Sequence, residues 1–178
     1  MSFAKIYTRG LLGLHAPQIE VEVHVSQGLP SLTIVGLAEA AVRESKDRVR
    51  SAIINSGFQF PTKRLTINLA PADLPKDGSR LDLPIALGIL IASGQLPENT
   101  TDDFEFIGEL ALDGHLRAAS GTLTIAMACQ AAQHRLMLPL ENAEEAAQLP
   151  DFKVYAASSL KQVCDHFLKA REIDAFLP

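Results

Sequence analysis

The chain has 178 residues, of which 47% are hydrophobic and 21% are charged, and its formal net charge is −5. This length and balance exclude general disorder and leave room for one sizeable folded domain. The negative charge also excludes nucleic-acid binding through the field of the whole molecule, so such binding would require a local basic patch.

The sequence contains no segment that predicts secretion or a membrane span. Its first 25 residues lack the basic start and long apolar stretch of a signal peptide, and "LPIALGILIASG" is too short to cross a bilayer. Cys129 and Cys164 lie far apart, which fits a reducing compartment where both are free and partly buried. We therefore expect a cytoplasmic protein without membrane contact.

The N-terminal part of the chain is predicted to form three strands and a helix. The strands are expected at residues 3–12, 17–26 and 31–37. In the second strand apolar and polar residues alternate, which predicts one buried and one solvated face; the apolar set is Ile19, Val21, Val23 and Val25. A helix over residues 38–56 follows, because small and apolar residues recur at helical spacing and Gly57 stands at the C-cap position.

The remainder of the chain is predicted to mix strands and helices. The expected order is a strand at 63–71, a polar loop, a helix ending near Gly94, a polar connector at 95–104, two strands joined at Asp113-Gly114, a helix over 122–133, a strand at 135–140, a short helix at 142–148, a strand at 153–157 and a helix at 159–170. Ser158 or Ser159 is expected to cap the last helix. This order favours a single α+β domain, a mixed sheet with packed helices, over a doubly wound parallel fold.

Two kinds of binding motif are absent from the sequence. No G-x-x-x-x-G-K-[ST] occurs, so the chain has no phosphate-cradling loop of the ATPase type. The five histidines show no metal-ligand spacing, and the adjacent Asp102 and Asp103 lie in a polar connector. We expect neither a metal nor a cofactor in this chain.

Three long segments resemble a known family. They are "GLPSLTIVGLAEAAVRESKDRVRSAIINSGFQFP", "RLTINLAPADLPKDGSRLDLPIALGIL" and "GELALDGHLRAASG", and they are similar to the N-terminal domain of the magnesium-chelatase-like AAA+ ATPases, the ComM/YifB family. The resemblance implies a Lon-like domain over residues 1–170, with the ribosomal S5 domain-2-like fold that Lon proteases also use, and the start of a linker at 171–178. The AAA+ module of the family, which would carry ATP and Mg, is not in this chain.

The resemblance also implies a function for the whole protein. Members of the ComM group form homo-oligomeric rings and drive branch migration of recombining DNA in natural transformation. This domain would then be a non-catalytic accessory to its own AAA+ module that contacts DNA, guides single-stranded or branched DNA, or supports subunit packing. A protein–protein adaptor without DNA binding, which uses a sheet edge or a loop, is the alternative.

Lon-type peptidases use a serine that is activated by a lysine of lowered pKa. In the matching segment Arg80 stands in the place of the nucleophile, and Ser79 comes one residue early. The family lysine is also missing, because Leu123 and Ile125 occupy its neighbourhood. Lys76 is expected in an exposed loop with a charged amine, so a hydrolase that uses Ser79 and Lys76 is a weaker alternative.

The loop that leads into the predicted helix ending near Gly94 has a structural and a functional interpretation. In the structural one, Asp82 is the N-cap, Pro84 lies in the first turn and Gly78 adopts a positive φ. In the functional one, Lys76 and Arg80 face a phosphate backbone or a neighbouring subunit, since a helix start favours anions.

Other basic residues are the remaining candidates for DNA or partner contact. Arg43 and Arg50 lie in the charged stretch "RESKDRVR", where Glu39–Arg43, Arg43–Asp47 and Glu44–Arg48 have the i, i+4 spacing of ion pairs and favour a solvated helix face. Lys63 and Arg64 precede a strand and extend this patch only if the fold brings them near.

Overall fold

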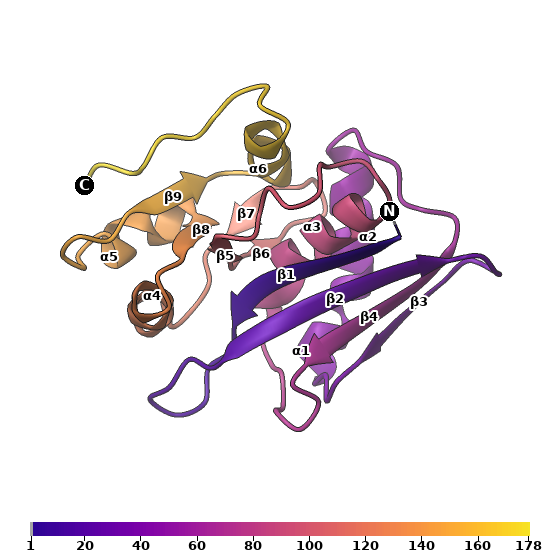
Figure 1. The fold of residues 1–178 in the computed structure, drawn as a ribbon, viewed down its shortest axis with the longest axis horizontal. Helices are drawn as coiled ribbons and strands as arrows, with labels where there is room; N and C mark the ends of the chain where they lie inside the picture. The colour runs from indigo at the N-terminus through magenta and orange to yellow at the C-terminus, as the bar shows by residue number, and fades with distance from the viewer. Residues whose placement is uncertain (1) are drawn as a thin grey trace.

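The computed structural model describes residues 2–178, which form a mixed sheet of seven strands with helices packed against it (Figure 1). Across the sheet the strands follow the order β3, β4, β2, β1, β5, β8, β9. Their bounds are β1 (Phe3–Arg9), β2 (Gln18–Ser26), β3 (Ser31–Val35), β4 (Arg64–Ala70), β5 (Phe104–Phe106), β8 (Arg135–Pro139) and β9 (Val154–Ala157). The mixed sheet confirms the predicted α+β class.

The helical layer is built around α3, which packs on β1 and β2. The helices are α1 (Ala40–Arg43), α2 (Ser45–Asn55), α3 (Asp82–Ala92), α4 (Thr122–Ala131), α5 (Ala143–Ala146) and α6 (Leu160–Phe167), with 3-10 turns η1 (Ser79–Leu81) and η2 (Leu140–Asn142). Figure 1 shows α2 and α3 behind the strands β1 to β4. A Cβ atom at Gly88 would lie 2.6 Å from Cγ2 of Val23, so the glycine allows α3 to approach β2 closely.

The β3-β4-β2-β1 half of the sheet has one buried face, as the alternation in the sequence predicted. Ile19, Val21, Val23 and Val25 are at most 7% exposed. Val21 lies between Ile6 of β1 and Leu69 of β4, both buried. Full burial of a side chain of this size stabilises the fold by about 1.5–3 kcal/mol.

The β5-β8-β9 half is parallel and is covered on both faces, as parallel strands usually are. On one face α4 and α5 pack on a cluster that includes Leu136 and Leu138. On the other face Phe167 of α6 packs edge-on against Phe104 and Phe106, with ring centroids 5.4 and 5.7 Å away.

The helix predicted over residues 38–56 differs from the observed one in two ways. It is divided into α1 and α2 at Glu44, and it begins at Ala40. Ala38 forms a parallel β-bridge with Lys76, so the backbone before Ala40 is extended rather than helical. The helix ends one residue before the predicted cap: Ser56 is the C-cap, and Gly57, directly after it, has the positive φ of +89° that favours glycine there.

The segment around Asp113-Gly114 contains three short strands rather than two. β6 (Glu109–Leu110) and β7 (Leu116–Arg117) form the predicted hairpin, whereas β5 joins the main sheet between β1 and β8. At α6, Ser159 is the N-cap and its hydroxyl accepts the N–H of Gln162 at 3.1 Å.

Residues 171–178 run back along β9. Ile173 and Phe176 pack against the two hydrophobic clusters, and the N–H of Phe176 donates to the carbonyl of Val154 at 2.8 Å. The tail therefore covers part of the outer edge of β9. The boundary at residue 170 and the linker after it stay a prediction.

A buried ionic cluster joins the two halves of the sheet. Glu105 of β5 is 0% exposed, and its two carboxylate oxygens accept Nε and Nη2 of Arg9 at 2.7 and 2.9 Å. Nδ1 of His134 lies 2.8 Å from the same carboxylate, and the His134 ring stacks on Tyr7. Because a buried charge is costly unless it is paired, the cluster ties β1 to β5 and to the start of β8.

Replacement of Glu105 by Gln is expected to lower the free energy of unfolding by about 3–5 kcal/mol, since Arg9 would remain buried without its counter-ion. The matched control is Glu20→Gln, which removes the exposed partner of Lys5 at 3.7 Å and should cost at most about 1 kcal/mol. Urea denaturation followed by circular dichroism measures both losses. Equal losses would contradict a structural role of the buried cluster.

Candidate nucleic-acid interface

Lys76 is buried, so the expectation of an exposed amine is wrong. The residue is 1% exposed, and Nζ donates to the carbonyl oxygens of Gly36, at 2.7 Å, and of Pro71. Its main chain bonds to Leu37 and Glu39. Burial lowers the pKa of the Lys76 amine. The side chain therefore ties the loop to the ends of β3 and β4 and is not available for a surface contact.

Arg80 also lies inside the protein rather than at a surface where it would face a phosphate. It is 9% exposed, with Nη1 donating to the carbonyl of Asp77 at 2.9 Å and Nη2 to Oγ of Ser120 at 3.3 Å. Burial lowers the pKa of its guanidinium group. The positive φ predicted for Gly78 is confirmed at +89°, and a Cβ atom there would collide with this guanidinium.

Asp82 is not the N-cap that the sequence predicted. It is the first residue of α3, it is 0% exposed, and its carboxylate makes no capping bond. It instead accepts Oγ of Ser45 at 2.5 Å, Nε of Arg48 at 2.7 Å and the N–H of Leu110 at 3.0 Å. Burial raises the pKa of the Asp82 carboxyl, and these hydrogen bonds oppose the increase. Pro84 lies in the first turn, as predicted.

The two groups of the Ser/Lys hypothesis do not meet. Oγ of Ser79 donates to a carboxylate oxygen of Glu109, whereas the Lys76 amine donates to two main-chain carbonyls. In the described residues no hydrogen bond joins Ser79 to Lys76.

The predicted i, i+4 ion pairs of the charged helix are not formed among residues 2–178. Arg48 pairs with Asp82 instead of Glu44, because the buried carboxylate accepts two of its nitrogens. Nε of Arg43 donates to the carbonyl of Ala38 at 3.0 Å. Arg43 lies at the end of α1 and bonds back to the segment before that helix, and the structure does not bring it together with the other candidates.

Arg50 and Lys63 do come together, around the connector between α2 and β4. Both line a small hollow of about 280 Å³, together with Lys46 and Asp47 of α2. The guanidinium carbon of Arg50 lies 5.2 Å from the ring centre of Phe60, within cation–π range.

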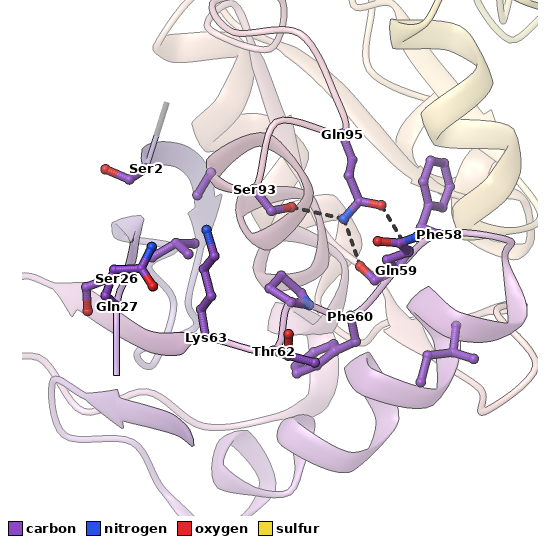
Figure 2. A pocket seen from close by; sticks show the side chains of 14 residues that line it. Ser2, Ser26, Gln27, Phe58, Gln59, Phe60, Thr62, Lys63, Ser93 and Gln95 are labelled. Carbon is purple, nitrogen blue, oxygen red and sulfur yellow. Dashed lines mark hydrogen bonds between the residues drawn. The ribbon is translucent and has the colours of Figure 1, made fainter. Parts of the chain in front are cut away.

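A larger hollow of about 1010 Å³ shares the lining residues 60–63 with the small one, Lys63 included (Figure 2). Its lining comes from the ends of β2, α2 and α3 and from the connector; the residues used below are Phe58, Phe60 and Lys63. Gln95 holds the connector in place, since Oε1 accepts the N–H of Gln59 at 2.9 Å and Nε2 donates to the Gln59 carbonyl at 2.8 Å. Figure 2 shows these bonds beside the hollow.

The basic residues at this end of the molecule have no acidic partners in contact. Arg50, Lys63 and Arg64 are exposed, and none of them forms an ion pair within the part of the chain that the structure describes. Arg64 begins β4 directly after Lys63. Unpaired cations beside partly buried aromatic rings are the chemistry that binds single-stranded nucleic acid.

Sequence reasoning named Arg50, Lys63 and Arg64 as candidates and counted Lys46 in the charged stretch, but it missed the aromatic residues beside them. The signal was present in "GFQFPTKR", where two phenylalanines two positions apart precede a basic pair. Among residues 2–178 no group of three His, Cys, Asp or Glu side chains could hold a metal ion. In the same range no helix is long and apolar enough to span a membrane.

Comparison with known proteins finds a matching family and several similar proteins. The family model described as subunit ChlI of Mg-chelatase matches residues 21–142. The competence protein ComM of Haemophilus influenzae is 48% identical over 172 residues, which are 97% of this chain and 34% of that protein. The YifB proteins of Salmonella typhimurium and Escherichia coli are 50% and 49% identical over 164 residues, 92% of this chain and 32% of each protein. The chain thus spans about a third of the length of these curated relatives.

Lys76→Met is expected to lower the free energy of unfolding by about 1–3 kcal/mol, because the carbonyls of Gly36 and Pro71 lose their donor. Lys63→Met makes the same chemical change at an exposed position and should stay within about 0.5 kcal/mol of the unchanged protein. Thermal and urea denaturation measure both. A Lys76 variant as stable as the Lys63 variant would show that the buried amine does not support the fold.

Proposed function

Because this chain belongs to the family of subunit ChlI of Mg-chelatase and the ComM and YifB proteins, we propose that it is a non-catalytic accessory domain that contacts DNA for an AAA+ ATPase. The observation that carries the proposal is the group of unpaired cations around Lys63 on a chain of net charge −5.

The positive charge of the proposed interface is local. Lys46, Arg50 and Lys63 line one hollow, and Arg64 follows at the start of β4. Asp47 is the acidic residue of that lining, so cations outnumber anions there. Phosphates of a DNA backbone release counterions when they meet such a group, which supplies affinity without base recognition.

The aromatic residues favour single-stranded or branched DNA over an intact duplex. Phe58 and Phe60 are partly buried and lie on the wall of the large hollow that also holds Lys63. Unpaired bases can stack on such rings while neighbouring phosphates meet the cations. Bases of an intact duplex are already stacked on each other and cannot use them.

The proposed function also involves the AAA+ module and the ring that the family resemblance implies. The AAA+ module, with ATP and Mg, would belong to the part of the relatives that this chain does not cover, which is about two thirds of their length. A homo-oligomeric ring would present several copies of the surface formed by Lys46, Arg50, Lys63 and Arg64. This multivalency would strengthen a weak single contact during branch migration.

The double variant Arg50→Glu, Lys63→Glu is expected to bind single-stranded and branched DNA at least about tenfold more weakly at low salt. It should also lower the slope of log K against log salt by about 2, since two phosphate contacts are lost. Fluorescence anisotropy with labelled oligonucleotides measures both quantities.

The matched control is Lys153→Glu, Arg171→Glu, which makes the same charge change at exposed positions just before β9 and after α6. Its affinity should change less than about threefold, because only long-range, screened repulsion remains. Equal losses in both variants, or no binding by the unchanged chain at low salt, would contradict the proposed interface.

An adaptor without DNA binding is favoured by one observation. Leu12 and Leu14 in the connection between β1 and β2 are 56% and 93% exposed, as in surfaces that meet protein partners. The anisotropy measurement separates the two functions, because an adaptor would show no salt-dependent DNA affinity.

The hydrolase alternative predicts a reactive serine. A serine-directed fluorophosphonate probe is expected to leave Ser79 unlabelled, since its hydroxyl donates to Glu109 and the Lys76 amine is bound elsewhere. Mass spectrometry after incubation checks this. Stoichiometric labelling that disappears in Ser79→Ala would show that the chain is a catalyst.

A further inference from the structure

Arg80 is a buried cation without a counter-ion. It is 9% exposed, and among residues 2–178 no carboxylate lies within ion-pair distance of its guanidinium group. Within the same range its Nε is enclosed and has no hydrogen-bond partner. A buried charge is costly unless it is paired, so this guanidinium group lacks a partner that its position requires.

Two other arginines of the same protein show what is missing. Arg9 is also 9% exposed, but both oxygens of the Glu105 carboxylate accept its nitrogens, at 2.7 and 2.9 Å. Arg48 donates in the same way to the buried carboxylate of Asp82. The bond to Asp82 raises the pKa of Arg48, whereas burial lowers the pKa of Arg80. The fold thus supplies an acid to Arg9 and to Arg48 but none to Arg80.

The guanidinium group of Arg80 is held in a fixed orientation. Nη1 donates to the carbonyl of Asp77 at 2.9 Å, and Nη2 donates to Oγ of Ser120 at 3.3 Å. A Cβ atom at Gly78 would lie 2.9 Å from Nη1, so the glycine leaves the space that the group occupies. A guanidinium group has five N–H donors, and these bonds use two of them. The group is therefore oriented but not saturated.

The guanidinium group meets the surface at Ser120. Ser120 and the following Gly121 are exposed. Asn142 fixes the loop before them, since Oδ1 accepts the N–H of Ala119 at 2.8 Å and Nδ2 donates to the Ala119 carbonyl at 2.9 Å. Arg80 is too enclosed for a DNA backbone, but a small ion beside Ser120 reaches Nη2.

The start of α4 adds a second reason to expect an anion at Ser120. Gly121 is the N-cap, no side chain caps it, and the first turn carries no acidic residue. Unpaired N–H groups and the dipole of a helix start favour negative charge. Oε1 of Glu145 accepts the N–H of Leu123 at 3.2 Å, which shows that this helix start accommodates an acidic oxygen.

We propose that Arg80, Ser120 and the start of α4 form a binding site for a phosphate group, either free or as a monoester. The phosphate oxygens accept N–H groups of Arg80 and the hydroxyl of Ser120, and they lie at the positive end of the α4 dipole. The phosphate supplies the counter-charge that the fold gives to Arg9 and Arg48. The site shares no residue with the surface proposed for DNA, so it is tested independently of that function.

Isothermal titration with inorganic phosphate, at constant ionic strength in chloride buffer, measures the binding. The unchanged chain is expected to bind at millimolar phosphate or below, and Arg80→Met should weaken binding at least about tenfold, because the buried cation is lost. Arg117→Met is the matched control at an exposed position three residues before Ser120, and it should change the affinity less than about threefold. No binding by the unchanged chain, or equal losses in both variants, would overturn the proposal.

A carboxylate introduced at Ser120 tests the site without removing Arg80. Ser120→Asp places an acid beside Nη2, so it should raise the melting temperature above that of Ser120→Asn and weaken phosphate binding at least about tenfold relative to it. Ser120→Asn has the same shape without the charge. Equal phosphate affinities of the two variants would overturn the proposal.

A parallel titration with AMP, a phosphate monoester, identifies the source of the phosphate. Tighter binding of AMP indicates a nucleotide, and tighter binding of the inorganic ion indicates free phosphate. In both cases the proposal requires that Arg80→Met abolishes the preference. A preference that persists in Arg80→Met would place the phosphate elsewhere and overturn the site.

Discussion

The carboxylate of Asp82 accepts hydrogen bonds from Ser45 and Arg48 of α2 and from the N–H of Leu110 in β6, and the position of the helical layer depends on it. The side chains that point from α2 toward Asp82 fix the rotation of this helix. With that rotation set, Arg50 projects from α2 over Phe60, at the wall of the basic surface. The buried Asp82 thus helps to hold the helix from which Arg50 reaches Phe60.

The charged loop before α3 shows why burial is hard to infer from a local pattern. Lys76 and Arg80 stand in a polar stretch that is typical of a solvated turn, yet both are enclosed. Each makes one contact with a distant part of the chain: the Lys76 amine donates to Gly36, just after β3, and Arg80 donates to Ser120, before α4. From the sequence alone, a charged residue that hydrogen-bonds to several loops cannot be distinguished from one that faces water. Only the tertiary contacts separate the two.

Features that depend on neighbouring residues were predictable from the sequence. The alternation in β2, the cap at Ser159 and the hairpin at Asp113-Gly114 follow from spacing and turn chemistry alone, and the structure contains all three. The cluster of Arg9 and Glu105 joins residues 96 positions apart and left no local signal. The basic residues around Lys63 were recognised in the sequence, but their meeting on one surface could not be predicted. It depends on how α2 packs against the sheet.

The two ends of the sheet are unlike, since the tail bonded to β9 covers one edge while β3 leaves the other open. A sheet with two open edges could add copies without limit and grow into filaments. Here, growth by strand addition is obstructed at β9 from the outset. The tail therefore blocks the addition of a further strand at β9, and the two edges of the sheet differ in what they offer to another chain.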